Sequence, residues 1–397
     1  MNETDQIKAE EDFSLVIGGP MFQLFRRAYL SGNTLELLRR RIVILVLVSW
    51  LPPLVISAFE GHAWGSSVNL PFLKDIDAHA RFLIALPLVV GAELVVHQRM
   101  AGVVRNFLNR SLIPSEAMPE FEAAVASARR WRNSVMAEIA LLGFVYGVGV
   151  LLIWRKLVEV QLTTWHGTTP DGTLHPSIAG WWFGLVSLPL FQFMLFRWYY
   201  RLVIWARFLW QVSRIKLNVL PTHPDRSAGL GFLSNVVYAF IPLLLAQGVL
   251  LSGMMANRVL YTSAQLSQFK VDILGLVLLV VVLVLAPLLV FSPQLAGAKR
   301  RARQEYGALA QTYVRQFDRK WLRGGAPHDE PFLGSGDIQS LADLGNSYQA
   351  IQEMRWVPFT TKTIMHLGIF TLAPLAPLTL TVIPLNDLVD RLLKIFF

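Results

Sequence analysis

The stretch Ile273–Phe291 reads ILGLVLLVVVLVLAPLLVF and contains no charged residue. A helix needs ~20 mostly apolar residues to cross the hydrocarbon core of a bilayer. Lipid cannot hydrogen-bond to the backbone, so an isolated segment that crosses a bilayer must satisfy its own polar groups by forming a helix. This stretch therefore predicts a transmembrane helix in an integral membrane protein.

Six further apolar runs resemble it in length. With Ile273–Phe291, the seven predicted segments are Ile42–Phe59, Phe82–Val96, Val135–Trp154, Ala179–Phe196, Phe232–Met255, Ile273–Phe291 and Ile364–Ile383. The last contains Pro374 and Pro377 near its middle, so it either spans or re-enters as a hairpin, and the side of the C-terminus depends on which. We predict an all-α polytopic membrane helix bundle with six or seven transmembrane segments.

The composition agrees with this fold class. Apolar residues make up 54% of the 397 positions and charged residues only 16%, whereas soluble domains average about 45–50% and about 25%. The chain has no cysteine, which excludes disulfide scaffolds and thiolate metal sites. The composition therefore argues against a soluble enzyme.

The basic residues are divided unevenly between the two faces. If the N-terminus is cytoplasmic, 28 of the 36 Lys and Arg residues fall on the cytoplasmic side and eight on the other. This is the bias that orients membrane proteins. We expect a plasma membrane, in particular a prokaryotic inner membrane, and contact of the basic face with anionic lipids. The same bias explains the net charge of +9 without nucleic-acid binding.

The same pattern divides the chain into four parts. Residues 1–41 form a cytoplasmic N-terminal segment, and 42–291 form a six-helix membrane domain with cytoplasmic connectors at 97–134 and 197–231. Residues 292–363 are predicted to be a cytoplasmic helical segment. Residues 364–397 hold the seventh segment and a C-terminal helix, whose apolar residues recur at a spacing of three to four and predict an amphipathic surface.

Proline recurs in six of the seven segments. The positions are Pro52, Pro53, Pro87, Pro189, Pro242, Pro287, Pro374 and Pro377. Prolines can kink helices and act as hinges, as the broken helices of transporters do. They are also simply more frequent in membrane helices than in soluble ones. Both interpretations stay open.

Three charged residues fall at one depth near the cytoplasmic ends of their segments, namely Glu93, Glu138 and Arg197. Ionisable groups in membrane helices are costly and usually face a partner or water. The three residues therefore predict either a structural ion-pair cluster or a charged constriction or proton-linked site that faces an inner cavity. His97 follows Glu93 on the same helical face, although no third ligand for a metal is in sight.

The string THPDRSAGLGFLSN, residues 222–235, is the most motif-like part of the sequence. Its candidate residues are His223, Asp225, Arg226, Gly229 and Gly231. The motif predicts a turn in which glycines permit tight backbone paths. It is either a cytoplasmic gate, latch or anion-binding nest, or a compact connector that docks on neighbouring helices.

The third predicted segment, Val135–Trp154, carries the motif Gly143-x-x-x-Gly147. Small residues at this spacing let two helices approach closely. The contact could lie within the chain or between the subunits of a homo-oligomer.

Enzyme signatures are missing from the sequence. It has no phosphate-binding loop, zinc-protease motif, nucleophile elbow or dinucleotide fingerprint. We therefore expect no enzyme activity, no cofactor and no bound metal. Two function classes remain: a channel or transporter of unknown substrate, and a non-transport scaffold, assembly factor or sensor that acts through its cytoplasmic helices.

Overall fold

The computed structural model describes residues 14–27, 37–149, 164–168, 175–262 and 264–381. Within these ranges the chain is almost entirely helical. Five helices are long and apolar enough to cross a membrane: Leu38–Phe59, Ile76–Asn109, Ile178–Val212, Phe232–Tyr261 and Leu266–Leu322. The prediction of an all-α, multi-pass membrane protein is therefore confirmed.

The third and seventh predicted segments are described only in part. Helix α7 (Val135–Phe144) continues through a π-helical turn, η4 (Val145–Gly149), and the remainder of this segment lies outside the described residues. Helix α16 (Thr361–Leu372) continues as the 3-10 segment η10 (Ala373–Thr381). The predicted C-terminal amphipathic helix also lies outside the described residues, so a total of six or seven spans stays a prediction.

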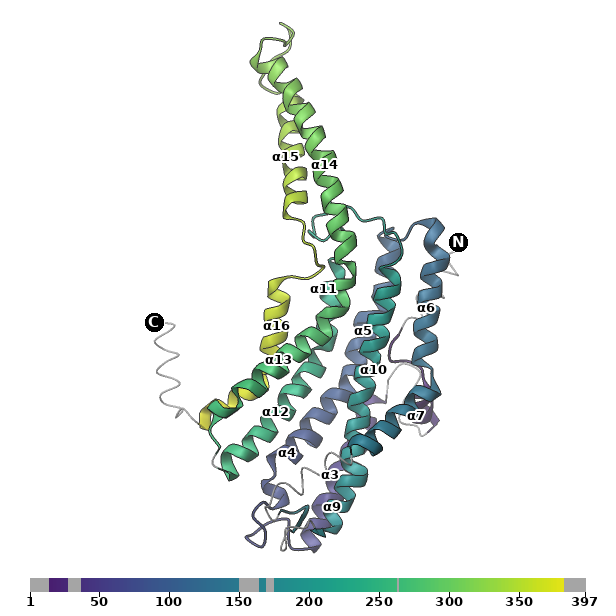
Figure 1. Ribbon diagram of the computed structural model, residues 1–397, viewed down its shortest axis with the longest axis vertical. Helices are drawn as coiled ribbons and strands as arrows, with labels where there is room; N and C mark the ends of the chain where they lie inside the picture. Colours follow the sequence, from purple (N-terminus) through teal and green to yellow (C-terminus); the bar gives the residue numbers. More distant parts are fainter. Residues whose placement is uncertain (1–13, 28–36, 150–163, 169–174, 263, 382–397) are drawn as a thin grey trace.

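Four long helices form the centre of the bundle (Figure 1). They are α3 (Leu38–Phe59), α5 (Leu86–Asn109), α10 (Leu188–Val212) and α12 (Ile241–Tyr261). Helix α13 (Lys270–Leu285) leads through η8 (Ala286–Phe291) into α14 (Ser292–Phe317), which projects far beyond the bundle together with α15 (Gly336–Glu353). We call the end of the molecule from which α14 and α15 project the hairpin end, and we call the opposite end the loop end.

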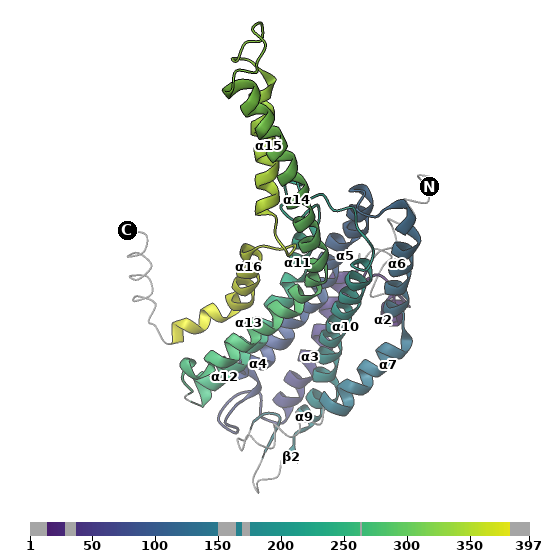
Figure 2. The same ribbon diagram turned by 45° about the horizontal axis from the view of Figure 1, so that its top comes forward.

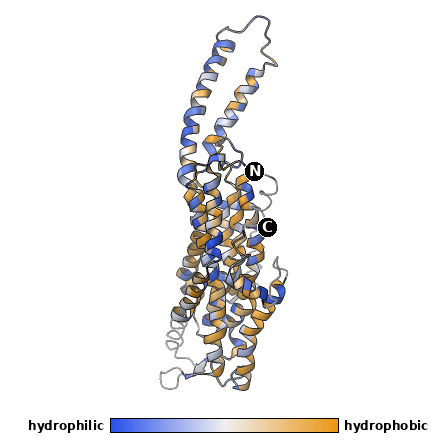
Figure 3. Ribbon diagram, turned by 90° about the vertical axis from the view of Figure 1, so that its right-hand side faces the viewer, coloured by the Kyte–Doolittle hydropathy of each residue, from blue (hydrophilic) through white to orange (hydrophobic). Residues whose placement is uncertain are grey.

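The remaining elements are short. They are α2 (Pro20–Arg27), η1 (Phe72–Lys74), α4 (Ile76–His79), η2 (Ala80–Ala85), η3 (Ser115–Ala117), α6 (Met118–Arg132), β1 (Gly167–Thr168), β2 (His175–Pro176), α9 (Ile178–Trp182), η5 (Phe183–Ser187), α11 (Phe232–Val237), η6 (Tyr238–Phe240), η7 (Leu266–Phe269) and η9 (Asp318–Leu322). Strands β1 and β2 pair antiparallel at the loop end. Apolar residues are concentrated in the bundle, and hydrophilic residues are more frequent in the projecting hairpin (Figure 3).

Several prolines stand where the helical hydrogen-bond pattern changes. The π-helical turns η2 and η5 end just before Pro87 and Pro189, and the 3-10 turn η6 ends just before Pro242. Proline has no N–H to donate and its ring crowds the preceding turn, so the α-helical pattern is interrupted there. Helix α3 nevertheless stays regular through Pro52 and Pro53.

A smaller apolar cluster around Met255 and Phe269 accompanies a large apolar core that runs along the bundle. Close approach of backbones fixes part of it. A Cβ added at Gly248 of α12 would lie 2.2 Å from the Thr371 carbonyl oxygen of α16. Only glycine permits this contact, so α16 is packed tightly on α12.

Candidate functional site

Glu93 is the centre of a buried charge cluster. It lies near the middle of the 34-residue helix Ile76–Asn109, and only 5% of its surface is exposed. A bare carboxylate at such a position would be very costly, so it needs cationic or hydrogen-bonding partners.

Three guanidinium groups supply these partners. Arg41 of α3 forms a direct ion pair with Glu93 Oε2. Arg201 Nη2 of α10 donates a 2.9 Å hydrogen bond to Oε1, and Arg197 Nη1 lies 3.7 Å from the same oxygen. All three arginines are buried. The cluster therefore ties α3, α5 and α10 together.

Glu138 of α7 extends the cluster. Its Oε1 lies 3.6 Å from Arg197 Nε, and its Oε2 accepts a 2.8 Å hydrogen bond from the Met21 backbone N–H. Two carboxylates thus face three guanidiniums. The cluster carries a formal excess of one positive charge and reaches α7 and α2.

Residues 14–27, from the predicted N-terminal segment, cover the cluster. The Ser14 carbonyl accepts a 2.6 Å hydrogen bond from Arg132 Nη1, and the Ser14 hydroxyl lies 3.0 Å from His97 Nδ1. The Arg41 guanidinium lies 5.0 Å from the centre of the Phe25 ring of α2, a distance suited to a cation–π contact. Figure 2 shows α2 beside α6 and α7.

Of the candidate residues, the structure brings Glu93, Glu138 and Arg197 together. His97 follows Glu93 on α5 but contacts Ser14, and no metal-binding group of acidic or histidine side chains occurs in the described ranges.

Sequence reasoning missed Arg41 and Arg201 as site residues. Arg201 lies one turn after Arg197 on the same face, a spacing that could have indicated it. Nothing local distinguishes Arg41 from the neighbouring Arg39 and Arg40, which are exposed.

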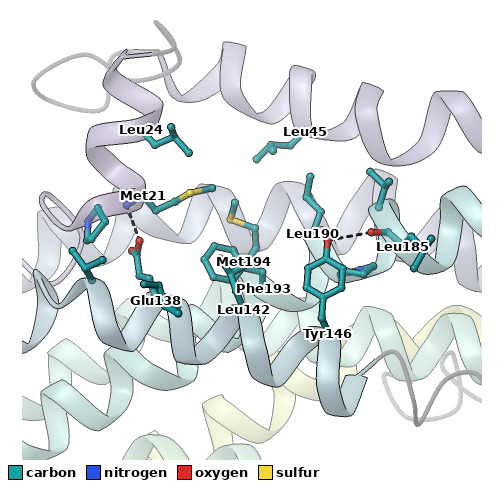
Figure 4. A pocket seen from close by; sticks show the side chains of 15 residues that line it. Met21, Leu24, Leu45, Glu138, Leu142, Tyr146, Leu185, Leu190, Phe193 and Met194 are labelled. Carbon is teal, nitrogen blue, oxygen red and sulfur yellow. Dashed lines mark hydrogen bonds between the residues drawn. The ribbon is translucent and has the colours of Figure 1, made fainter.

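An apolar groove of about 570 Å³ lies beside the cluster. Its walls come from α2, α3, α7 and α10 with η5 (Figure 4). Glu138 is the only charged residue among the fifteen that line it. Tyr146 donates a 3.1 Å hydrogen bond to the Leu185 carbonyl at the other end. The groove is therefore apolar along its length and acidic at one end.

The acidic end has spare hydrogen-bonding capacity. Glu138 Oε2 is occupied by the Met21 N–H. In the part of the chain that the structure describes, Oε1 accepts no hydrogen bond, and its ion pair with Arg197 is loose at 3.6 Å. A carboxylate oxygen in such a place can accept a hydrogen bond from a ligand.

The loop motif is organised around Asp225. Its Oδ1 accepts hydrogen bonds from the backbone N–H groups of Ser227 (2.8 Å) and Gly229 (3.1 Å), and its Oδ2 accepts one from Gly231 (2.8 Å). Burial raises the pKa of this carboxyl, but these backbone donors and His223 together hold the pKa below its ordinary value. The donors that could form an anion-binding nest are thus occupied by the loop's own carboxylate.

This loop also holds the base of the hairpin. Arg355 donates hydrogen bonds to the Asp225 carbonyl (2.7 Å) and, through its backbone N–H, to the Arg226 carbonyl (2.8 Å). Arg226 pairs with Glu353 at the end of α15 (2.9 Å). Arg226 and Ala228 have positive φ angles of 54° and 53°, which cost free energy in non-glycine residues. The interlocked contacts stabilise this conformation.

A second buried carboxylate, Asp75, lies at the loop end with 3% of its surface exposed. It accepts hydrogen bonds from Trp165 Nε1 (2.8 Å), Asn257 Nδ2 (2.7 Å) and the Ala78 N–H (3.0 Å). The His166 ring stacks on Trp165, and its Nε2 is 4.0 Å from Asp75. Burial lowers the pKa of His166 to about 4, although Asp75 acts in the opposite direction. The imidazole is therefore neutral at pH 7.

Gly143 and Gly147 face open space. A Cβ added at either glycine would meet no atom within 4 Å. No close helix contact forms at these glycines within the described residues, and the alternative of packing between subunits stays a prediction.

A scan of protein-family models, a search of curated proteins and a search of solved structures each found no match to this chain.

Proposed function

We propose that the protein is a membrane transporter that carries an amphipathic, lipid-like substrate. The substrate's apolar chain would occupy the groove between α3, α7 and α10, and its polar end would meet Glu138. The observation that carries the proposal is the junction of an apolar groove and a buried charge cluster at a single carboxylate.

The position of the groove supports entry from the bilayer. Ile139, Leu142 and Leu185, which line it, are all substantially exposed, and they belong to helices that we place in the hydrocarbon core. A groove of this kind opens sideways to lipid rather than to water. From Glu138 to Tyr146 it follows about 12 Å of helix, a length suited to part of an acyl chain.

The free acceptor on Glu138 supports a headgroup with hydrogen-bond donors. An ammonium or hydroxyl group could donate to Oε1, whereas a quaternary ammonium has no N–H to offer. We therefore expect a preference for an amine-bearing lipid over a choline lipid.

The burial of the cluster favours a carrier over an open channel. Glu93 is buried, and Trp198, which donates a 2.8 Å hydrogen bond to the Val89 carbonyl one turn earlier on the same helix, is 1% exposed. A water-filled constriction would leave the carboxylate partly solvated. In this proposal the Glu93 cluster fixes the helices around which α7 moves, and Glu138 links that cluster to the substrate.

The orientation in the proposal rests on the Lys and Arg bias. It places the hairpin end and the N-terminus in the cytoplasm, and the protein in the plasma membrane of a prokaryotic cell. Glu138 then lies toward the inner leaflet, at the first turn of α7. We assign no catalytic reaction to the protein.

The proposal can be tested with purified protein in liposomes. The probes are phosphatidylethanolamine and phosphatidylcholine, each labelled with a fluorophore on one acyl chain, and dithionite bleaching reports their movement between leaflets. Leu190→Trp places an indole in the groove. Leu278→Trp is the matched control, because Leu278 is an exposed α13 residue outside the groove.

We expect the protein to accelerate movement of the ethanolamine lipid more than that of the choline lipid. Leu190→Trp should abolish the acceleration and Leu278→Trp should preserve it. Equal rates in liposomes with and without protein, for both probes, would refute the proposal. Current steps in a planar bilayer would instead indicate a channel.

The projecting hairpin favours a second candidate function, docking of a cytoplasmic partner. Near its tip Leu322 and Leu333 are exposed, the latter by 82%, and exposed apolar clusters often mark protein contacts. Affinity purification in mild detergent should recover a partner with the wild-type chain and lose it with Leu322→Ser and Leu333→Ser combined. Recovery of the wild-type chain alone would count against this function.

A further inference from the structure

A basic pocket of about 500 Å³ lies where the hairpin leaves the bundle. Its lining comprises three cationic residues of α14, Lys299, Arg300 and Arg303, together with Ala296, Gln304 and Trp356. No carboxylate lines the pocket. This composition differs from that of the charge cluster, where each cation has an acidic partner nearby.

Two of the three cations of this pocket are held by neutral groups. Lys299 Nζ donates to the carbonyls of Gln352 (2.8 Å) and Met354 (2.6 Å) at the end of α15. Arg303 Nη2 donates to Gln352 Oε1 (2.5 Å). Arg300 makes no hydrogen bond or ion pair with any described residue. Three positive charges are thus positioned in one pocket, and no described residue that lines it carries a counter-charge.

Glu353, the residue that follows Gln352 at the end of α15, does not supply a counter-charge to the pocket. Glu353 pairs with Arg226 of the loop motif at 2.9 Å. An anion from outside the chain would complete the pocket, and guanidinium groups bind phosphate oxygens through paired N–H donors.

The place of the pocket in the chain puts it at headgroup depth. Ala296 follows Phe291, the last residue of the apolar run, by five residues, or about 8 Å of helix. Trp356 likewise lies five residues before Thr361, where α16 begins. Tryptophan is enriched at this interface, and 65% of the Trp356 side chain is exposed.

We propose that this pocket binds the phosphate of an anionic phospholipid in the leaflet at the hairpin end. Arg300 and Arg303 contact the phosphate oxygens, Lys299 adds its charge, and Trp356 lies against the glycerol and upper acyl region. A soluble phosphate ester would gain the same charge contacts but would leave Trp356 exposed to water. The lipid is therefore the ligand that uses the whole pocket.

Native mass spectrometry of the detergent-purified chain provides the test. Phosphatidylglycerol is titrated into wild type, Arg300→Gln and Arg301→Gln, with phosphatidylcholine of the same acyl chains as the neutral probe. Arg301 is a matched control because it is the next residue, exposed, and outside the pocket lining. Thermal unfolding of each variant shows that the fold is retained, which we expect because Arg300 has no bond to lose.

Arg300→Gln should weaken phosphatidylglycerol binding about fivefold, as expected for one charge near a lipid surface, while Arg301→Gln changes it much less. Equal losses in the two variants would indicate general attraction and overturn the site, as would equal binding of the two lipids. Displacement of the lipid by inorganic phosphate at similar concentration would overturn the lipid assignment in favour of a soluble anion.

Discussion

The two carboxylates that are buried among the described residues, Glu93 and Asp75, are stabilised in opposite ways. Glu93 is surrounded by three guanidinium groups from two other helices. Asp75, at the loop end, is equally buried but accepts hydrogen bonds from an indole, an amide and a backbone N–H. One carboxylate is balanced by charge and the other by neutral donors.

This difference indicates what each region does. Charge pairs across α3, α5 and α10 act over several ångströms and hold separate helices in one arrangement. The hydrogen bonds from the neutral donors around Asp75 are short and directional, and they fix the start of α4 against Trp165 and against Asn257 of α12. Removing either carboxylate should therefore destabilise the protein, but by unequal amounts.

The largest effect is expected for Glu93→Gln. The change leaves three buried guanidiniums without their shared counter-charge, and breaking a buried pair in this way costs about 3–5 kcal/mol. Thermal unfolding in detergent should show a strongly lowered midpoint. Glu120→Gln, an exposed change on α6, should leave the midpoint unchanged.

A second substitution sharpens this prediction. Adding Arg201→Gln to Glu93→Gln removes one of the unpaired cations, so part of the lost stability should return. If the double variant is less stable than the single one by the full cost of losing Arg201, the charge imbalance is not the cause.

Asp75→Asn should have an intermediate effect. The amide keeps the shape of the carboxylate, but it replaces an acceptor with a donor and removes the charge. A hydrogen bond to a charged group contributes about 1.5–3 kcal/mol. A midpoint lowered less than that of Glu93→Gln is expected, with the exposed Asp329→Asn as control. An unchanged midpoint would show that the neutral donors contribute little.

The smallest effect is a loss of stability in acid through His166. Its folded pKa of about 4 lies below the value of about 6.5 expected when unfolded. The unfolded state thus binds a proton more readily, and stability falls as the pH drops from about 6.5 toward 4. At pH 5 the loss is about 2 kcal/mol.

His166→Gln should remove the part of the acid sensitivity that comes from His166. The unfolding midpoint of this variant should therefore change less than that of wild type between pH 7 and pH 5. Parallel losses in both proteins would assign the acid sensitivity to other groups. The comparison is made between the two pH values within each protein, which separates the titration from any constant cost of the substitution.

Much of the fold could be predicted from sequence because lipid imposes a simple rule. Apolar runs long enough to cross a bilayer must be helical, and five of the seven predicted runs coincide with long apolar helices. The extent of these helices was not predictable in the same way. Helix Ile76–Asn109 continues thirteen residues past Val96, because its polar continuation is held by packing rather than by lipid.

The candidate site was predictable where charge interrupts an apolar run. Glu93, Glu138 and Arg197 are conspicuous for this reason, and the structure brings them together. Arg41 and Asp75 were missed because each lies at the edge of a segment, where charged residues are usual. Their burial depends on contacts with Phe25, Trp165 and Asn257, which are distant in sequence.

Crosslinking can show directly whether the groove that ends at Glu138 holds an amine-bearing lipid. A benzophenone amino acid is placed at position 142, in the groove wall, or at position 278, on the outer surface of α13. After irradiation in native membranes, mass spectrometry identifies the lipids attached at each position. We expect amine-bearing lipid to be enriched at position 142 relative to position 278. The same lipid composition at both positions would contradict it.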